Sequence, residues 1–388
     1  MLALKVLHLI KTPHGATWAQ RQIAVLLKKG ILVHVAVPDM GPATQVYEAM
    51  GVKVHRIQVD IARMKNPLKY LSARAEFRDL VAKEEFDLLH SHFVGTTIFA
   101  RLALGRRSGI PRIFQVPGPL HLENAVTRFA ELSTAGPADY WLATCKATQN
   151  IYLSKGIAEE RVGLSYYGLN GEQFKATKHL DLRQELGLPS QTTVIGMVSY
   201  FYPPKKWLGQ KQGIKGHEDL IDALVLLGAR GHKFVCVFVG GTWGSDTAYE
   251  MFVKRLAYEK LGERAVFLGT RTDVSELYAN FSLVVHPSHS ENVGGAAESL
   301  FLGVPTVATN VGGLPDLVIE GETGWLANSH DPYSLSVQIE RAITDRSEAK
   351  RRSINGQKLA KHLFDVERTG VEVASFYAHV VGCSREHQ

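Results

Sequence analysis

Residues 283–327 constrain the fold of this chain more than any other stretch. A short apolar run, Leu283–His286, ends at Pro287 and is followed by a loop of small residues, SENVGG. Residues 296–302 have the pattern of one or two helical turns, and Thr306–Thr309 is the next apolar run. A strand, a glycine-rich loop, a helix and a second strand in this order predict part of a parallel sheet covered by helices.

The loop before that helix suits a phosphate group. Glycines let backbone N–H groups converge, and the N-terminus of a helix carries a partial positive charge. Glu291 stands in this loop, and Glu298 stands on the predicted helix. A carboxylate within reach of a sugar accepts hydrogen bonds from two neighbouring hydroxyls, so the stretch predicts a sugar phosphate site.

The rest of the chain shows the same alternation of strands and helices. In the first half, helical patterns alternate with apolar runs that we predict as strands at residues 6–10, 31–37, 87–92, 112–116 and 140–144. A second series begins at residue 193. Because 388 residues exceed one ordinary core, the sequence predicts two α/β domains, each with a doubly wound parallel sheet. Ligands of such sheets bind beyond the carboxyl ends of the strands.

The stretch at residues 283–327 resembles the donor-nucleotide motif of the retaining glycosyltransferases of family 4, which have the GT-B fold. Residues 298–305 match the family pattern E-x-x-x-x-G-x-P, and residues 309–316 and 321–327 match its next two blocks. The resemblance implies two Rossmann-like domains that face a central cleft. A polar segment near residues 171–189 is the predicted linker.

The resemblance also implies the role of each domain. Residues 1–175 are expected to bind the acceptor, and residues 190–365 are expected to bind the nucleotide sugar. Residues 366–388 are expected to form a helix that returns to the first domain.

In this family a loop glutamate contacts the donor sugar, and a helix glutamate contacts the ribose of the nucleotide. The resemblance assigns these roles to Glu291 and Glu298, with Gly294 and Gly295 beside the donor. The two glutamates have six residues between them where the family has seven. Ser290 is therefore an alternative occupant of the first position.

Charge for the diphosphate is expected from lysine. Lys215 precedes a predicted helix and matches the lysine with which the family binds phosphate. Tyr200 is expected to contact the donor, although the family has an arginine at its position. Arg271 lies in the block that holds the nucleobase in the family. The missing positive charge has three candidate sources, with exposed solubilising lysine as the alternative for each: Lys205, Lys206 and Lys211.

The first domain supplies further candidates. The resemblance places Gly15 over the donor diphosphate and His121 near the reacting groups, where many relatives carry a His-Gly pair. We expect His14, Trp18 and His92 to contact the acceptor. A histidine at a strand end is more often structural, so packing is the alternative for His92.

The implied activity is metal-independent transfer of a hexosyl group, such as Glc or GlcNAc, to a hydroxyl of a glycan, lipid-linked or small-molecule acceptor. A UDP-sugar is the first choice of donor and a GDP-sugar the second. No cofactor is expected, because the sequence has no D-x-D pair, and lysine with helix dipoles can stabilise the leaving group. Alternatives are an aminocyclitol glycosyltransferase of aminoglycoside assembly, a GT-B epimerase or phosphorylase, and a regulator that binds sugar nucleotides.

Charge is divided unevenly along the chain. Residues 1–180 hold 23 of the 44 Lys and Arg and 14 of the 38 Asp and Glu, a net +9, so the remainder is −3. This excess suits peripheral membrane contact or an anionic lipid acceptor, and solvated helix faces are the alternative. Nucleic acid is not expected, because the basic run lacks interleaved aromatics.

The location is predicted to be cytoplasmic, with peripheral contact at the inner face of the membrane as an option. No apolar run approaches the ~20 residues of a membrane span. The N-terminus is predicted to be a strand and not a signal peptide. Three scattered cysteines without metal-ligand spacing fit a reducing compartment.

Overall fold

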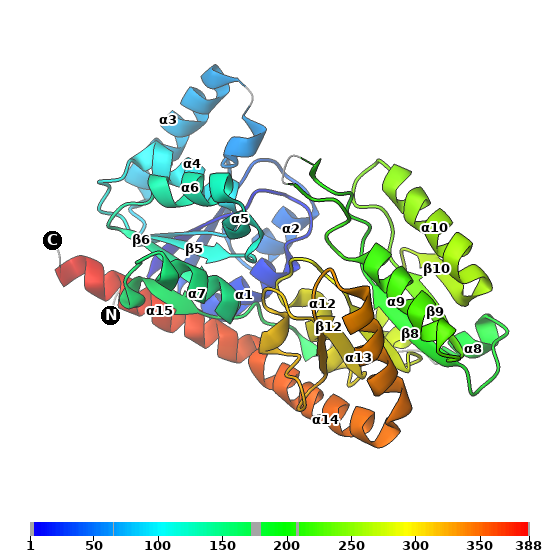
Figure 1. The fold of residues 1–388 in the computed structure, drawn as a ribbon. Helices are drawn as coiled ribbons and strands as arrows, with labels where there is room; N and C mark the ends of the chain where they lie inside the picture. The colour runs from blue at the N-terminus through cyan, green and yellow to red at the C-terminus, as the bar shows by residue number, and fades with distance from the viewer. Residues whose placement is uncertain (1–3, 65, 172–179, 207–208, 387–388) are drawn as a thin grey trace. The chain divides into compact units, whose positions relative to one another are not determined.

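The computed structural model describes residues 4–64, 66–171, 180–206 and 209–386. The chain divides into two compact units (Figure 1). Unit 1 comprises residues 1–170 and 363–388, and unit 2 comprises residues 171–362. Residues 172–179, which include the predicted end of the first domain, lie outside the described residues.

Unit 1 contains a parallel sheet of seven described strands in the order β3-β2-β1-β4-β5-β6-β7. β1 pairs with β2 on one side and with β4 on the other, so the strand order reverses at β1. Such a switch point brings the loops after β1 and β4 together at the carboxyl edge of the sheet. The strands are β1 (Lys5–Leu9), β2 (Leu32–Val37), β3 (Lys53–Arg56), β4 (Leu88–Ser91), β5 (Arg112–Val116), β6 (Asp139–Ala143) and β7 (Val162–Leu164).

A helix from the far end of the chain completes the core of unit 1. Val373 and Tyr377 of α15 are buried together with Val6 of β1 and Ile23 of α1. The helices of this unit are α1 (Thr17–Lys28), α2 (Pro42–Ala49), α3 (Pro67–Glu84), α4 (Val94–Leu104), α5 (Leu120–Glu123), α6 (Ala125–Thr134), α7 (Lys146–Ser154) and α15 (Val366–Glu386).

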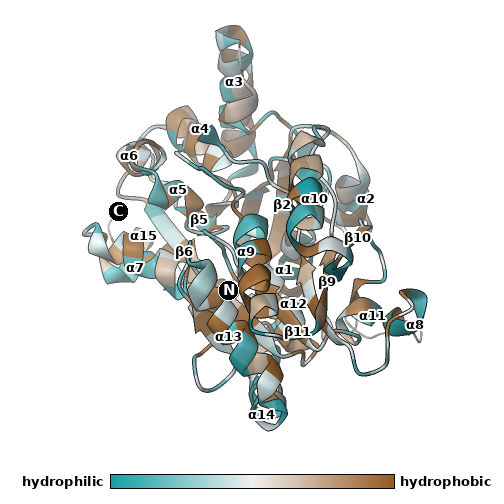
Figure 2. Cartoon of the chain, turned by 45° about the vertical axis from the view of Figure 1, so that its right-hand side comes forward, coloured by the Kyte–Doolittle hydropathy of each residue, from teal (hydrophilic) through white to brown (hydrophobic). Residues whose placement is uncertain are grey.

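The basic helix α3 is attached to its unit by a small area. The Asn66 side chain accepts a hydrogen bond from the Leu68 N–H and so caps the helix. Only Ala73 and Phe77 of α3 are buried, whereas Leu68 is 73% exposed. Both ribbon views show α3 standing out from the sheet of unit 1 (Figures 1 and 2).

Unit 2 repeats this plan with a sheet of six described strands in the order β10-β9-β8-β11-β12-β13. β8 lies between β9 and β11, so the order reverses at the first strand, as in unit 1. The strands, all parallel, are β8 (Thr193–Val198), β9 (Phe234–Val239), β10 (Ala265–Gly269), β11 (Leu283–His286), β12 (Thr306–Thr309) and β13 (Trp325–Ala327).

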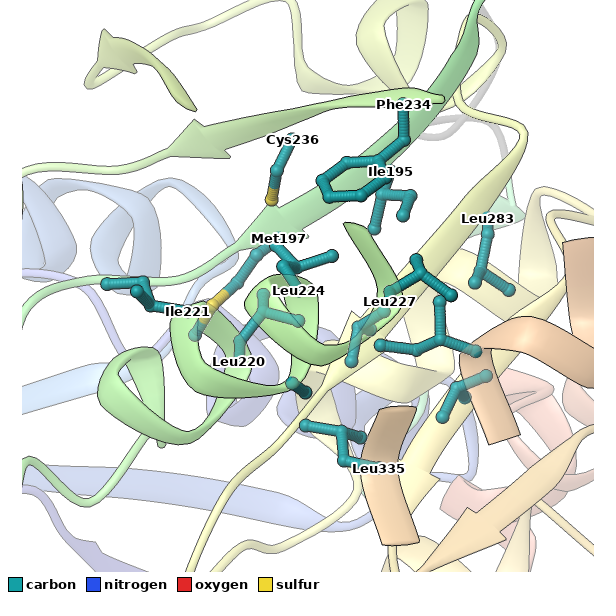
Figure 3. Close-up of a cluster of buried hydrophobic side chains, with 14 of the residues drawn as sticks. Ile195, Met197, Leu220, Ile221, Leu224, Leu227, Phe234, Cys236, Leu283 and Leu335 are labelled. Carbon is teal, nitrogen blue, oxygen red and sulfur yellow. The ribbon is translucent and has the colours of Figure 1, made fainter. Parts of the chain in front are cut away.

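The core of unit 2 lies between the sheet and its helices. Figure 3 shows Ile195 and Met197 of β8 near Leu220 and Leu224 of α9, and all four side chains are buried. In Figure 2 the helices carry hydrophobic and hydrophilic residues side by side, as helices that cover a sheet do. They are α8 (Leu182–Glu185), α9 (His217–Ala229), α10 (Ala248–Leu261), α11 (Val274–Tyr278), α12 (Gly294–Phe301), α13 (Pro332–Thr344) and α14 (Arg346–Leu363).

The predicted linker continues into unit 2. Leu182 of α8 is fully buried among Val194, Leu277 and Phe281. Among the described helices, none has both the length and the apolar character that crossing a bilayer requires.

Candidate functional site

The loop after β11 holds its glutamate in a fixed position. The Glu291 carboxylate forms an ion pair with the Lys215 ammonium through Oε2. Ser288 Oγ donates to the same oxygen at 3.1 Å, and the Asn292 N–H donates to Oε1 at 3.1 Å. The side chains of Glu291 and Lys215 are 15% and 22% exposed, so this pair is partly screened from solvent. The structure therefore brings together two residues that the sequence predicts for catalysis.

Two glycines allow the surrounding backbone to pack this closely. Gly216 has φ 72°, and a Cβ there would lie 1.9 Å from the Pro287 carbonyl oxygen. Gly312 has φ 54°, and a Cβ there would lie 1.9 Å from the Glu291 carbonyl oxygen. Any larger residue would push apart the loops that carry Lys215 and Glu291.

The first turn of α12 lies next to this pair in sequence. The helix begins at Gly294, so Gly294 and Gly295 lie inside its first turn and the predicted start at residue 296 is wrong. The N-cap residue Val293 makes no side-chain cap hydrogen bond, and the first N–H groups of a helix favour an anion. A Cβ on Gly295 would lie 3.4 Å from the His286 ring, which explains the tight packing of this turn.

The second glutamate of the motif lies on the same helix. Glu298 is half-buried, and its negative charge adds to burial in raising the pKa of Tyr278 well above the usual value. Tyr278 lies on α11 and is 1% exposed. Glu298 and Glu291 thus share one region of unit 2, as the motif requires.

An aromatic ring lies beside Lys215 and belongs to a group of three rings. The Lys215 ammonium lies 5.8 Å from the ring centroid of Tyr202. Burial, followed by the charges of Glu291 and Tyr200, raises the pKa of Tyr202 to about 12. Tyr200 is 42% exposed, and its ring lies 5.3 Å from that of Trp243. Sequence reasoning missed Tyr202, although an aromatic beside the lysine-rich insertion is a usable signal.

The other residues of unit 2 that are predicted to contact the donor are Arg271 and the lysines of the insertion, and they have different surroundings. Arg271 forms a fork with Asp273, at 2.7 Å from Nε and 2.6 Å from Nη2. Its Nη1 also lies 3.4 Å from Glu185 Oε1 of α8, so this guanidinium is paired with two carboxylates. The three lysines of the insertion are exposed: Lys205, Lys206 and Lys211.

In unit 1, the loop after β1 has a left-handed backbone at two successive residues. Gly15 has φ 69° and Ala16 has φ 53°, and Ala16 is the N-cap of α1. His14 is exposed beside them. Trp18, in the first turn of α1, lies 4.2 Å from the Tyr167 ring and 5.0 Å from the His92 ring, measured between centroids.

Beneath Trp18 lies a cluster of buried imidazoles. His8 Nδ1 and His92 Nε2 are 2.9 Å apart, and the Tyr377 hydroxyl bonds both His8 Nε2, at 3.2 Å, and His90 Nδ1. All three histidines are 0% exposed. Burial lowers the pKa of His8 to about 3 and holds those of His90 and His92 well below the usual value. His92 therefore has no exposed surface for the acceptor contact that the sequence predicts, and its position fits the packing alternative.

His121 lies on the short helix α5. Its Nε2 lies 3.4 Å from the Tyr152 hydroxyl, and burial lowers its pKa to about 4. The ring is therefore neutral at pH 7, which leaves one nitrogen able to accept a proton.

Comparisons with known proteins agree with this anatomy. Residues 15–172 match the family described as Glycosyltransferase Family 4, and residues 208–359 match the family described as Glycosyl transferases group 1. The first match contains Gly15 and His121, and the second contains Lys215, Glu291 and Glu298.

Two curated relatives are similar over different shares of the chain. The capsular polysaccharide biosynthesis glycosyltransferase CapM of Staphylococcus aureus is 24% identical over 96% of this chain and 96% of its own. The D-inositol 3-phosphate glycosyltransferase of Corynebacterium diphtheriae is 27% identical over 58% of this chain, and the match spans about half of that protein, 52%.

Among solved structures, HepE of Anabaena in complex with UDP aligns with a TM-score of 0.76 at 22% identity. The alignment covers 96% of this chain and 99% of that one. The same protein has been solved with UDP-glucose and aligns with a TM-score of 0.75. At this identity the likeness establishes the fold.

Proposed function

We propose, since this chain belongs to the family 4 glycosyltransferases of the GT-B fold, that it transfers a hexosyl group with retention from a nucleotide-diphosphate sugar to an acceptor hydroxyl. The observation that carries the proposal is the ion pair of Lys215 with Glu291, next in sequence to the uncapped first turn of α12. A UDP-sugar is the proposed donor, and the UDP complex of HepE supports this choice.

The leaving diphosphate is the group that this site must stabilise. Lys215 turns from Glu291 to the phosphate oxygens when the donor binds, and N–H groups of Gly294 and Gly295 add hydrogen bonds. Hydrogen-bonding groups that are fixed in place before the reaction stabilise the negative charge as it forms on the diphosphate. The step therefore needs no divalent ion.

Release of Lys215 also prepares Glu291 for the sugar. Its carboxylate keeps the hydrogen bonds from Ser288 and from the Asn292 N–H, so the oxygens stay in place for two sugar hydroxyls. The Glu298 carboxylate accepts hydrogen bonds from the ribose hydroxyls. The acceptor attacks on the face that the diphosphate leaves, and a phosphate oxygen takes the acceptor proton, which retains the configuration.

The acceptor is proposed to be a glycan or a lipid-linked glycan. The similarity to CapM supports polysaccharide assembly. The basic first unit supports an anionic lipid carrier, since α3 exposes Leu68 beside Lys69 and would rest on a membrane surface. A cationic aminocyclitol is the less favoured acceptor, because a net positive surface repels it.

Nucleotide binding and donor turnover test the proposal in sequence. We expect UDP to raise the melting temperature of the full chain more than GDP or ADP does. Turnover of the matching UDP-sugar should then need an acceptor and persist in EDTA. Absence of a shift with every nucleoside diphosphate would overturn the proposal. Conversion of the donor without any acceptor would indicate an epimerase, and loss of turnover in EDTA would overturn the metal-free step.

A further inference from the structure

Three side chains from one helix and two loops of unit 2 meet close to the proposed donor site. Asp219 lies in the first turn of α9, His289 lies in the loop after β11, and His330 immediately precedes the N-cap of α13. Each offers one ligand atom, and the three atoms lie within 4.8 Å of one another. Asp219 is 4% exposed, whereas His330 is exposed, so an ion can reach the cluster from solvent.

The cluster is held together before any ion binds. His289 Nε2 and Asp219 Oδ2 lie 2.9 Å apart, and the rings of His289 and His330 lie 3.7 Å apart at their centroids. The His289 N–H donates to the Ile214 carbonyl oxygen at 2.8 Å, which fixes its backbone. Around a tetrahedral zinc ion, bonds of about 2.0–2.2 Å place ligand atoms roughly 3.4 Å apart. Small side-chain rotations would bring these three atoms to that spacing.

His330 has an unusual backbone. Its φ is 58°, which a residue other than glycine seldom adopts. Strain of this kind persists where the surroundings enforce it, and it is concentrated at functional positions. Here it directs an imidazole against His289, where a glycine or asparagine would satisfy the turn alone.

Two other groups of possible ligands are less suitable. In His34, His55 and Glu84 the carboxylate already pairs with Lys5 at 2.7 Å and with Lys53 at 2.5 Å. Two ammonium groups repel a metal ion from such a site. The imidazoles beneath Trp18 are fully buried, and His8 already bonds His92 and Tyr377, so an ion has no entry path to this cluster from solvent.

We propose that Asp219, His289 and His330 bind a divalent transition-metal ion, with zinc preferred. Two imidazoles and one carboxylate form a ligand set that zinc accepts, and a fourth position remains for water. The ion would tie the start of α9, which follows Lys215, to the loop that carries Glu291. It takes no part in sugar transfer, so the site lies beyond the proposed function.

Metal binding is tested on the full chain after EDTA treatment and dialysis. Co²⁺ is titrated as a spectroscopic probe, because tetrahedral Co²⁺ absorbs strongly in the visible range, and Zn²⁺ is then added as a competitor. We expect saturation at one ion per chain, displacement by Zn²⁺ and a higher melting temperature with Zn²⁺. His330→Asn retains a residue that tolerates a left-handed backbone, and it should weaken binding at least about tenfold.

His55→Asn is the matched control, because it removes a ligand from one of the rejected clusters. It should leave the affinity unchanged, and His289→Ala should abolish binding. Unchanged affinity in His330→Asn, or weaker binding in His55→Asn, would overturn the proposal. UDP binding by the His330→Asn variant is measured in parallel, and its retention distinguishes failure of the metal site from failure of the proposed function.

Discussion

The two units begin in the same way and then carry opposite chemistry. In each, the first strand lies at the reversal point of the sheet, and a residue with a left-handed backbone precedes the next helix: Ala16 before α1 and Gly216 before α9. Around the first of these helices lie neutral imidazoles and aromatic rings. Around the second lies an ionised pair, Lys215 with Glu291.

The difference teaches that the sheet decides where a site lies, whereas a few side chains decide what it does. At the switch point of unit 1, burial keeps the imidazoles of His8, His90 and His92 neutral. Such a surface suits an uncharged sugar ring over Trp18. Unit 2 keeps a half-exposed ammonium at its switch point, and this suits a diphosphate.

Acid should destabilise unit 1 more than unit 2, and this difference in stability is the largest effect expected. An imidazole that is neutral when folded gains a proton on unfolding, so its stabilising contribution is present above its unfolded pKa of 6.5 and is lost as pH falls towards the folded value. Between pH 7 and pH 5 each fully buried imidazole lowers the free energy of unfolding by about 2 kcal/mol. Unit 1 contains His8, His90 and His92, whereas unit 2 contains His217 and His286, with pKa values lowered by burial to about 3 and about 4.

Hydrogen exchange resolved by peptide measures this difference. At pH 5 we expect β4 to lose protection before β11 does, and at pH 7.5 both should be protected. Equal loss in the two strands would show that the neutral cluster does not set the acid limit of unit 1.

Removal of the Lys215 ammonium tests the proposed role of charge in unit 2. Lys215→Ala should lower the turnover number by about 100-fold or more, because the departing diphosphate loses its fixed positive charge. Steady-state kinetics with the identified donor measure this effect. Lys211→Ala, an exposed lysine of the neighbouring insertion, is the control. A large loss in that variant and a small one in Lys215→Ala would move the leaving-group role to the insertion.

The helix glutamate sharpens the comparison at the level of binding. Glu298→Ala should weaken UDP binding by about 1–3 kcal/mol, because charged hydrogen bonds to the ribose are lost. Isothermal titration calorimetry gives the affinity. Glu263→Ala changes an exposed glutamate of the same unit and should have no effect. Unchanged UDP affinity in Glu298→Ala would refute the ribose contact.

The smallest effect concerns the hydroxyl under the imidazole cluster. Tyr377→Phe leaves ring nitrogens of His8 and His90 without their partner, and it should lower the free energy of unfolding by about 1–2 kcal/mol. Urea unfolding measures the loss, with Tyr333→Phe, 66% exposed, as the control. UDP affinity should stay the same, since the changed group belongs to unit 1.

Much of the fold could be predicted from local pattern. The strand at Arg112–Val116 and the two strands around the glutamate motif have the predicted bounds. β3 was not predicted, because Lys53–Arg56 is short and alternates charge with apolar character, and only pairing with β2 makes it a strand. The start of α12 was placed too late, because glycine is a poor helix former in isolation and Gly294 and Gly295 therefore read as loop.

The site was predictable where the motif determines it. Glu291 and Lys215 stand 76 residues apart, and the family pattern predicted both while only the fold shows that they touch. His92 was singled out at the end of a predicted strand, but its contact with His8 depends on strand order, which local sequence does not reveal. Asp219, His289 and His330 share no spacing that signals a ligand set, because their meeting depends on one helix and two separate loops.

The origin of α15 has a consequence for biosynthesis. Unit 1 needs Val373 and Tyr377 from that helix, yet all of unit 2 is translated between them and residue 170. Residues 1–170 therefore leave the ribosome with apolar surface exposed, and α15 covers that surface only after unit 2 has been synthesised. Unit 1 therefore completes its core after unit 2 has been synthesised, and until then its uncovered apolar surface is open to aggregation.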